Sequence, residues 1–464
     1  MKKFSPLLVI FLSSFSIVIC QSVPANNWKL SISSNRKYLQ HENGTPFFWL
    51  ADTGWLLFKK LNYEEAEKYF DDREKKGFNV IQVMIIHSAP AVNVYGDSAF
   101  VNNDASFPKT RNKDNSKSGY WNYIDRLLDL AAKKNIYLAL VPVWGSNVKN
   151  GFINKKNIES YAQFLAERYK NKPNLIWING GDIKGNENLD VWNKLGETLK
   201  KYDKNHLITF HPFGRMQSSS WFQNKEWLDF NMFQSGHKDY SQDQNGFAED
   251  NWKYVENDLK KTPLKPVLDG EPSYENIPHG LHDSLQTRWK AYDARRYAYW
   301  SVFAGACGHT YGNNAVMQFH KPADGKGAYG VTDYWTDAIN APGSGQMNFL
   351  KKLILSRPYF ERIADQSIIA DSIGSKYNYI TATRGNDYLF VYSYQRKILQ
   401  INLGIISGEF INVSWLNPRN GKTTLIGKYI NKGIKTFVAP DSESEKNDWV
   451  LVIDDASKNY KTDF

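Results

Sequence analysis

Two short apolar segments of this chain each end in small residues and a carboxylate. Residues 174–182 read Asn-Leu-Ile-Trp-Ile-Asn-Gly-Gly-Asp, and residues 265–271 read Lys-Pro-Val-Leu-Asp-Gly-Glu. An apolar run of this length is typical of a buried parallel strand, and the residues that follow such strands build the active sites of parallel α/β sheets and barrels. Cleavage of a bond between sugars uses two carboxyl groups, one as the acid and one as the base or nucleophile. Asp182 and Glu271 are therefore candidate catalytic residues for that chemistry.

The chain around these two carboxylates alternates between predicted strands and predicted helices. The predicted strands are residues 47–51, 80–86, 136–143, 175–178, 206–210, 228–233, 266–269 and 305–311. The predicted helices are residues 62–76, 121–134, 158–169, 191–202, 252–260, 284–303 and 346–355. Eight strands with intervening helices over roughly 300 residues predict an α/β fold of the (β/α)₈ TIM-barrel type. A doubly wound sheet is the alternative, but it has fewer strands and a glycine-rich phosphate-binding turn, which is not seen in this sequence.

The pattern changes after Arg357. Short segments of strand character follow at residues 379–383, 387–392, 399–403, 411–415, 436–439 and 449–453, separated by turn residues such as Asn420-Gly421. They predict a small antiparallel β-sandwich. We divide the chain into a signal peptide over 1–20, a catalytic barrel with an N-terminal β-hairpin over 21–357, and the sandwich over 358–464. We interpret the sandwich as a support for the barrel, with independent glycan binding as the alternative.

The N-terminus has the pattern of a secretory signal. Met1-Lys-Lys-Phe is followed by the apolar run Leu7-Leu-Val-Ile-Phe-Leu and by further apolar and serine residues up to Cys20. A positive start followed by such a run predicts export, so we expect a secreted or periplasmic protein. Cleavage near Cys20 is favoured, and lipidation of Cys20 on a surface lipoprotein is the alternative. No later stretch approaches about 18 consecutive apolar residues, so we predict no transmembrane segment.

The charge and cysteine content narrow the choice of ligands. The 464-residue chain has a formal net charge of +10, and its lysines are spread without a concentrated tract, which argues against a nucleic-acid partner. Diffuse positive charge favours an anionic substrate such as an acidic polysaccharide, and a lysine-rich solvated surface is the alternative. Two cysteines and scattered histidines offer no zinc spacing, so we predict no metal and no cofactor. The sequence indicates no oligomeric state.

In a barrel, the residues just past the strands meet at one rim. Reading those positions gives a polar and aromatic set: Asp52, His87, Trp144, Asp182, His211, Gln234, Glu271 and His309. With the two carboxylates set apart as catalytic, the predicted substrate contacts are Asp52, Trp55, His87, Trp144, His211, Gln234, His237, His309 and Tyr311. The rings of Trp55 and Trp144 can stack on sugars, and core packing is the alternative for both. The long polar segment 88–118 is predicted to cover one side of the cleft.

The two carboxylates are predicted to have different roles. Glu271 acts as the nucleophile and Asp182 as the acid/base, because a neighbouring negative charge raises the pKa of Asp182. A structural alternative for Asp182 is the N-cap of a short turn. For Glu271 the alternative is an ion pair with Arg295 or Arg296. Asp269 is a competing carboxylate, but it falls within the predicted strand and is interpreted as a support for Glu271.

Several motifs match a known family. They are residues 48–55 (Phe-Trp-Leu-Ala-Asp-Thr-Gly-Trp), 77–82 (Gly-Phe-Asn-Val-Ile-Gln), 177–182 (Trp-Ile-Asn-Gly-Gly-Asp), 269–272 (Asp-Gly-Glu-Pro) and 308–312 (Gly-His-Thr-Tyr-Gly). With these motifs the barrel resembles the apiosidase-like glycoside hydrolases. The C-terminal part, with Trp415-Leu-Asn-Pro-Arg and Trp449-Val-Leu-Val-Ile-Asp, resembles the β-sandwich that usually follows that barrel and is labelled as collagen-binding.

The resemblance implies a retaining glycosidase in which Asp182 matches the acid/base and Glu271 the nucleophile. The best-known activity of the family is release of apiose from side chains of rhamnogalacturonan II, an acidic pectin. The wider barrel superfamily usually has Asn-Glu at the end of the fourth strand, whereas this chain has Gly-Asp. The expected substrate is thus a polysaccharide or oligosaccharide. Two alternatives stay open: a glycosidase for another plant sugar, and a non-catalytic protein that binds a glycan or matrix.

Overall fold

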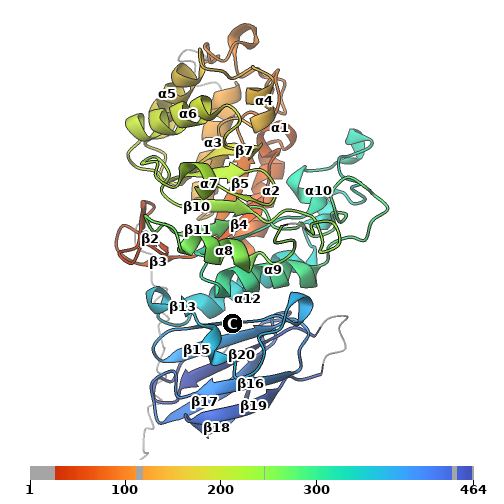
Figure 1. Cartoon of the computed structure of the whole chain (residues 1–464). Coiled ribbons are helices and arrows are strands. Elements are labelled where there is room, and N and C mark those ends of the chain that lie inside the picture. Colours follow the sequence, from red (N-terminus) through yellow and green to blue (C-terminus); the bar gives the residue numbers. More distant parts are fainter. Residues whose placement is uncertain (1–26, 111–118, 245, 442–446, 462–463) are drawn as a thin grey trace, which may run out of the picture.

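The computed structural model describes residues 27–110, 119–244, 246–441, 447–461 and 464, and shows a barrel stacked on a sandwich (Figure 1). The predicted signal peptide and Cys20 lie outside the described residues, as does part of the segment 88–118. Within the described ranges, every helix falls short of the length and apolar character that a membrane span needs. The N-terminal hairpin is present as a three-stranded sheet of β1 (Leu30–Ile32), β2 (Leu39–His41) and β3 (Pro46–Phe47).

Eight parallel strands form the barrel, as predicted. They are β4 (Trp49–Thr53), β5 (Val80–Met84), β6 (Tyr137–Val141), β7 (Leu175–Ile183), β8 (Ile208–Pro212), β10 (Asn231–Gln234), β11 (Val267–Asp269) and β12 (Gly308–Tyr311). Their order is β8-β7-β6-β5-β4-β12-β11-β10, and the short β9 (Met216–Gln217) pairs antiparallel with β10. The wall closes between β8 and β10, where Asp229 N donates to Ile208 O at 2.8 Å and Thr209 Oγ1 donates to Phe230 O at 2.7 Å.

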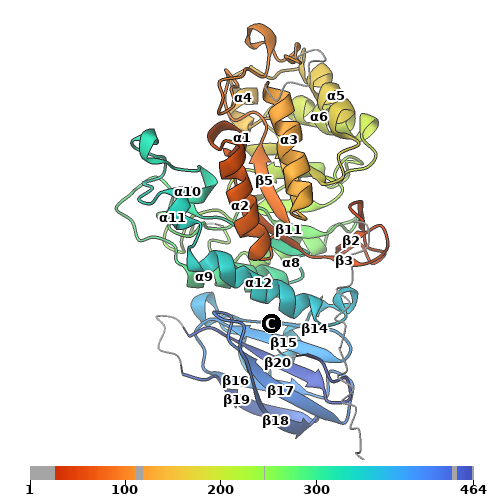
Figure 2. The same ribbon diagram turned by 180° about the vertical axis from the view of Figure 1, so that it is seen from behind.

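Helices surround this wall (Figures 1 and 2). They are α1 (Leu57–Lys60), α2 (Tyr63–Lys75), α3 (Tyr120–Lys133), α4 (Gly145–Lys149), α5 (Ile158–Tyr169), α6 (Leu189–Tyr202), α7 (Ser219–Phe222), α8 (Trp252–Leu259), α9 (Ala291–Phe303), α10 (Asn314–Met317), α11 (Trp335–Ala338) and α12 (Pro342–Leu355). Local chemistry sets their starts. At α2, Asn62 Oδ1 accepts from Glu65 N and Glu65 Oε2 accepts from Asn62 N, each at 2.9 Å, which is a capping box.

The predicted helix over 284–303 is wrong in its first part. The structure has helix only from Ala291, because Asp293 Oδ2 accepts from Lys290 N at 3.0 Å and begins a new first turn there. The preceding chain folds back on itself instead, with Asn276 N donating to Trp289 O and His279 N donating to Thr287 O, both at 2.8 Å. These cross-chain bonds satisfy backbone groups that a helix would otherwise pair. The resulting loop follows the carboxyl end of β11.

The C-terminal part is an antiparallel sandwich, as predicted. One sheet has the order β13 (Ile363–Ala364), β14 (Ile380–Arg384), β15 (Tyr388–Ser393), β20 (Trp449–Asp455), β17 (Phe410–Leu416) and β18 (Thr423–Ile430). The second sheet pairs β16 (Ile398–Leu403) with β19 (Gly433–Val438). The sequence did not predict β18, since Gly427 interrupts it and most of its residues are partly or fully exposed, so no apolar alternation marks it.

The sandwich packs tightly on α9 and α12 of the barrel (Figure 2). The rings of Tyr299 and Tyr392 stack across the junction with centroids 4.6 Å apart. Arg295 of α9 donates two hydrogen bonds of 2.8 Å to the carboxylate of Asp448 in the sandwich, and both side chains are buried. Such a buried, shared core fits the interpretation of the sandwich as a support for the barrel.

We predict that Asp448→Ala lowers the free energy of unfolding by about 3–5 kcal/mol, because the change leaves the Arg295 guanidinium buried without its partner. Urea denaturation measures this loss. The matched control is Asp441→Ala, whose carboxylate is 86% exposed in a pair with Lys397 and should contribute only about 0–1 kcal/mol. Equal losses in the two variants would show that the junction does not hold the domains together.

Candidate active site

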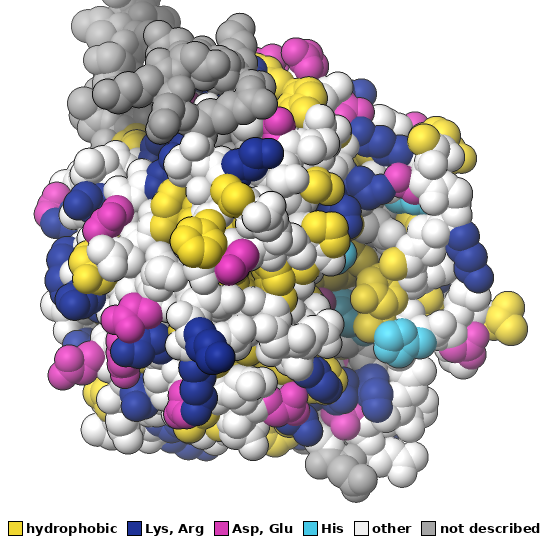
Figure 3. Space-filling view, turned by 90° about the horizontal axis from the view of Figure 1, so that it is seen from above, with side chains coloured by type: hydrophobic (Ala, Val, Ile, Leu, Met, Phe, Trp, Pro, Cys, Tyr) yellow, Lys and Arg dark blue, Asp and Glu magenta, His cyan; other side chains and the backbone are white. Residues whose placement is uncertain are grey.

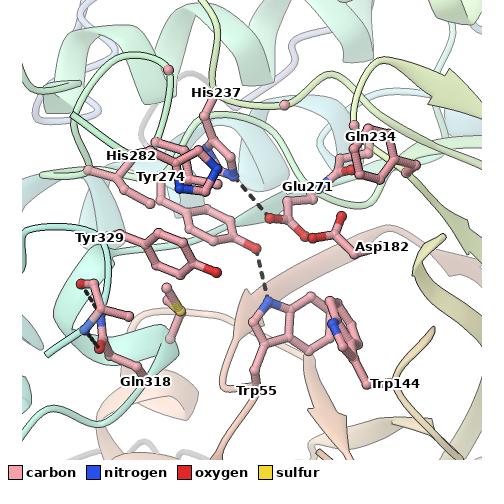
Figure 4. Close-up of a pocket in the computed structure, with 18 of the residues that line it drawn as sticks. Trp55, Trp144, Asp182, Gln234, His237, Glu271, Tyr274, His282, Gln318 and Tyr329 are labelled. Carbon is pink, nitrogen blue, oxygen red and sulfur yellow. Dashed lines mark hydrogen bonds and ion pairs between the residues drawn. The ribbon is translucent and has the colours of Figure 1, made fainter. Parts of the chain in front are cut away.

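A cavity of about 550 Å³ opens at the carboxyl ends of the barrel strands. Figure 3 looks onto a hollow in this face, where histidine and hydrophobic side chains line the walls. Both predicted catalytic carboxylates line it, together with Trp55, His87, Trp144, Gln234 and His237 of the predicted contacts (Figure 4). A concave, largely apolar cavity with a few convergent polar groups is typical of a ligand site.

The end of β7 turns sharply to place Asp182 at the cavity. Gly180, Gly181 and Asp182 all have positive φ, at 83°, 114° and 51°, and the pairing of β7 with β8 is irregular there. A Cβ on Gly181 would lie 2.5 Å from the indole of Trp144, so only glycine lets that ring pack over the turn. Asp is one of the few residue types that tolerates the left-handed region. The turn therefore aims the Asp182 carboxylate at the cavity.

We predict that Gly181→Ala lowers kcat/KM by about 100-fold, since displacing a catalytic group by about 1 Å has effects of that size. Steady-state kinetics on a cleaved glycoside measures it. Gly151→Ala is the control, because Gly151 also has a positive φ, of 78°, but nothing within 4 Å of its would-be Cβ. Both changes place alanine at a positive φ, so equal kinetics would mean that the contact with Trp144 does not position Asp182.

Two histidines hold Glu271. His237 Nε2 lies 2.9 Å from Glu271 Oε1, and His211 Nε2 lies 3.2 Å from Glu271 Oε2. The backbone carbonyl of His237 accepts from Gly280 N at 2.7 Å and from Trp289 Nε1 at 3.3 Å, and these bonds hold the backbone that carries the imidazole. The sequence alternative of an ion pair with Arg295 or Arg296 does not occur, since Arg295 binds Asp448 and Arg296 binds Glu249. Glu271 thus faces the cavity and its histidines.

The surroundings drive the pKa values of the two carboxyls apart. Desolvation of the carboxyl by the cavity walls, followed by the negative charge of Glu271, raises the pKa of Asp182 to about 6, although the residue stays open to solvent. Burial would also raise the pKa of Glu271, but the contacts with His211 and His237 outweigh it and lower that pKa to about 2. At mildly acidic pH, Asp182 is then protonated while Glu271 is ionised. Paired carboxyls with separated pKa values are the arrangement of an acid and a nucleophile.

The neighbouring carboxylate Asp269 has a supporting position. Its Oδ2 accepts from Ser235 Oγ at 2.7 Å and from Asn251 Nδ2 at 3.0 Å, and it does not line the cavity. Burial raises its pKa to about 6 as well. Asp269 is the last residue of β11, and its bond with Ser235 links the chain just before Glu271 to the segment that follows β10.

The two tryptophans both pack and line the cavity. Trp55 and Trp144 have ring centroids 5.3 Å apart, and the ring of His211 lies 5.4 Å from Trp55 and 5.7 Å from Trp144. Trp55 Nε1 donates to Tyr274 OH at 3.1 Å. Core packing is therefore observed for both rings, and stacking on a sugar in the cavity stays a prediction.

Three predicted substrate contacts face away from the cavity. Asp52 is fully buried against α2, where its Oδ2 accepts from Tyr69 OH and from Arg73 Nε, both at 2.6 Å. Tyr311 pairs with Asp52 across β12 and β4, and its hydroxyl donates to Glu275 Oε2 at 2.6 Å. His309 lies two residues earlier, on the same face of β12.

All three lie within their strands, so the alternation of side chains turns them to the outer face of the wall. The placement of Asp52, His309 and Tyr311 corrects the expectation that they contact substrate directly. The described part of the segment predicted to cover the cleft, residues 88–110, contributes no side chain to the cavity.

Sequence reasoning missed much of the cavity wall. The missed residues come from loops after β8, β10, β11 and β12: Phe213, Arg215, Lys238, Tyr274, Ile277, Leu281, His282, Met317, Gln318 and Tyr329. Loops carry no hydrophobic period, so nothing in the sequence pattern marks their side chains. Tyr274 alone could have been predicted to line the cavity, because it lies three residues after the candidate catalytic residue Glu271.

The sequence also missed a donor set that could hold a metal ion. Asp182, His211 and Glu271 each offer a ligand atom within 4.8 Å of the others, although they are distant in the sequence. One imidazole and two carboxylates suit several divalent ions. The same proximity is expected of a catalytic carboxylate pair, so the donor set alone does not assign a metal.

Two family models match the chain. The one described as "Apiosidase-like, catalytic domain" matches residues 33–361, and the one described as "Putative collagen-binding domain of a collagenase" matches residues 363–454. The chain belongs to the apiosidase-like family. The resemblance in the barrel motifs is thereby confirmed, and the apiosidase-like domain contains every residue of the cavity described above. A comparison with curated proteins gives no match.

Solved structures similar to this apiosidase-like chain are glycoside hydrolases. One named "Glycoside hydrolase" is 48% identical with a TM-score of 0.90, and the match covers 94% of this chain and 98% of that one. A glycoside hydrolase family 5 protein from Bacteroides vulgatus ATCC 8482 is 45% identical with a TM-score of 0.90 over 94% and 95% of the two chains. A further structure from that organism shares only the fold, at 14% identity and a TM-score of 0.66 over 92% of this chain and 82% of that one. The apiosidase-like chain is a glycoside hydrolase, and a glycan is its substrate.

Proposed function

We propose that this protein is an exported, retaining exo-glycosidase that removes a terminal sugar, with apiose first among the candidates, from pectic side chains such as those of rhamnogalacturonan II. The observation that carries the retaining mechanism is the closeness of the two carboxylates. Oxygens of Asp182 and Glu271 lie within 4.8 Å of each other across the cavity. Retaining enzymes keep their carboxyls about 5–5.5 Å apart, whereas inverting enzymes need about 6.5–9.5 Å for a water molecule.

The reaction then has two steps. Glu271 attacks the anomeric carbon while Asp182 donates its proton to the leaving oxygen, so the glycosidic bond breaks as the glycosyl–Glu271 bond forms. Water enters, Asp182 takes its proton, and the hydroxide oxygen attacks the anomeric carbon to release Glu271. His211 and His237 keep Glu271 ionised before the attack.

The charge around the cavity supports an acidic glycan. Arg215 and Lys238 both line the cavity. Arg215 Nε also forms a long ion pair with Asp243 Oδ1, at 3.8 Å. A uronic acid next to the released sugar would find these cations at the rim. The secretory pattern of the N-terminus supports export, since polysaccharides are met outside the cell.

The test is release of free sugar from a panel of substrates. Rhamnogalacturonan II fragments and p-nitrophenyl glycosides of apiose, arabinose and galactose are incubated with the wild type, and the anomer formed first is identified by NMR. Release of apiose with retention supports the whole proposal. Release of another sugar with retention would change the proposed sugar and leave the mechanism unchanged. Initial formation of the opposite anomer would overturn the retaining mechanism. Enzyme treated with EDTA is assayed in parallel, and loss of turnover there would reassign Asp182, His211 and Glu271 to a metal.

A further inference from the structure

Two loops build one side of the cavity. Residues 274–290 follow β11 and residues 318–334 follow β12, and we call them together the loop wall. The residues that the loop wall presents to the cavity are Tyr274, Ile277, Leu281, His282, Gln318, Ala328 and Tyr329. In Figure 4, Tyr274 and Tyr329 of the loop wall lie beside the carboxylate pair, and the Tyr274 hydroxyl accepts directly from Trp55 Nε1 at 3.1 Å.

Side chains tie the two loops into one body. Arg288 Nη1 donates to Asn276 O at 2.8 Å within its own loop, and Arg288 Nη2 donates to Gly330 O at 2.6 Å in the other. Asn276 Nδ2 donates to Asp333 Oδ2 at 2.6 Å and adds a second link. Charged groups strengthen such bonds. Neither loop can move outward alone without breaking these links.

Tyr329 is forced into the cavity by its own backbone. Its φ of 54° lies in the left-handed region, which a bulky residue adopts only when its surroundings impose it. Gln318 imposes it from the preceding residue, accepting from Ala328 N at 2.9 Å and donating to Ala328 O at 3.1 Å. Asn314 Nδ2 donates to Tyr329 O at 2.9 Å. Strain of this kind concentrates at functional sites.

The ring of Tyr329 points at the place where a sugar would be cleaved. Figure 4 shows the ring beside Tyr274 with its hydroxyl directed toward the middle of the cavity. The side chain is 37% exposed, so it is open to a ligand. Burial, then the charges of Asp182 and Glu271, raise the pKa of Tyr329. The hydroxyl therefore keeps its proton and can donate a hydrogen bond near both carboxylates.

We propose that Tyr329 is a specificity-determining residue whose hydroxyl binds the terminal sugar between Asp182 and Glu271, and whose ring closes the cavity beyond that sugar. This inference rests on the proposed glycosidase function and deepens it. The loop wall then limits this side of the cavity to one sugar unit, so that only a chain end fits. Arg288 is a positioning residue, since it acts by holding Gly330 next to Tyr329.

Two variants separate the hydroxyl from the ring. Tyr329→Phe removes only the donor, and we expect kcat/KM on the glycoside that the wild type cleaves to fall about 5- to 100-fold. Tyr329→Ala also opens the end of the cavity. From reducing-end-labelled pectic oligosaccharides, the wild type should release monosaccharide alone, whereas Tyr329→Ala should release disaccharide as well. Arg288→Met keeps Tyr329 but removes its support, so this variant should also release some disaccharide.

Tyr334→Phe and Tyr334→Ala are the matched controls. Tyr334 belongs to the same loop and is 41% exposed, but its ring stacks on His320 with centroids 5.5 Å apart and does not line the cavity. The controls should keep wild-type kinetics and product length. Melting temperatures of all variants identify any loss that comes from unfolding.

The outcomes distinguish this inference from the function on which it rests. If the wild type releases sugar and the Tyr329 variants match the Tyr334 controls in rate and product length, the inference is overturned and the glycosidase function stands. If Tyr329→Phe loses rate but Tyr329→Ala still releases only monosaccharide, the closure is wrong. A wild type that cleaves no glycoside overturns the proposed function and the inference with it.

Discussion

Replacing Glu271 with glutamine or alanine is expected to lower kcat by about 10⁴-fold or more, because removing a nucleophile leaves only the binding and electrostatic parts of catalysis. The carboxylate is held ionised by His211 and His237, so no other group in the cavity can take its place with the same charge and position. The measurement is turnover of the sugar glycoside that the wild type cleaves.

Azide makes the expected result specific. In Glu271→Ala the missing carboxylate leaves room for the small anion, which should restore turnover and give a glycosyl azide of inverted configuration. Glu275→Gln is the matched control, since Glu275 is an equally buried glutamate bound to Tyr311 and Gly343 but does not line the cavity. It should keep activity within about tenfold, in line with a loss confined to one supporting hydrogen bond. Near-wild-type turnover of Glu271→Gln would remove Glu271 from the nucleophile role.

Replacing Asp182 with asparagine is expected to lower kcat/KM on natural glycosides by about 10²–10⁴-fold, the range for losing a general acid. Asp182 donates only when protonated, and its pKa is raised to about 6. Wild-type kcat/KM should thus be full below that pH and fall as pH rises through it. The acid limb lies near pH 2, where Glu271 takes up a proton. Asp182→Asn should abolish the fall near pH 6, and should lose less on p-nitrophenyl glycosides, whose leaving group needs no proton.

Asp269→Asn is the control for that pH profile, because burial raises the pKa of Asp269 to about 6 too. Asn can still accept from Ser235 and Asn251, so this variant should keep the fall near pH 6. If the fall near pH 6 disappears in Asp269→Asn and persists in Asp182→Asn, the general acid has been assigned to the wrong residue.

The pH dependence of the melting temperature tests the raised pKa of Asp182 independently of catalysis. A carboxyl with a raised pKa in the folded state loses stability as pH rises from its ordinary 3.8 toward about 6. Asp182→Asn removes that loss, so its melting temperature should exceed that of the wild type at pH 8 and match it at pH 3. Equal melting temperatures of wild type and variant at both pH values would mean that folding does not raise the pKa of Asp182.

The loop wall is the part of the protein that sequence patterns predicted least well. Residues 284–290 have helical composition, yet Arg288 and the backbone bonds of Asn276 and His279 hold them in a folded-back loop. Tyr329 stands in a segment without periodicity, and its direction depends on Gln318 and Asn314. Local propensity is a weak guide wherever side chains from another loop satisfy the backbone.

The sequence by itself determined the barrel, the sandwich and the two candidate catalytic carboxylates. Apolar runs of the right length give the strands, and Gly180 and Gly181 before Asp182 give the sharp turn, since these depend only on neighbouring residues. Only the tertiary structure decided which strand-end residues reach the cavity. Side chains alternate across a strand, so Asp52 within β4 points outward to Arg73, whereas Trp55, two residues past the end of β4, reaches the cavity. The closeness of Asp182, His211 and Glu271 also arises only when the strands close into a barrel.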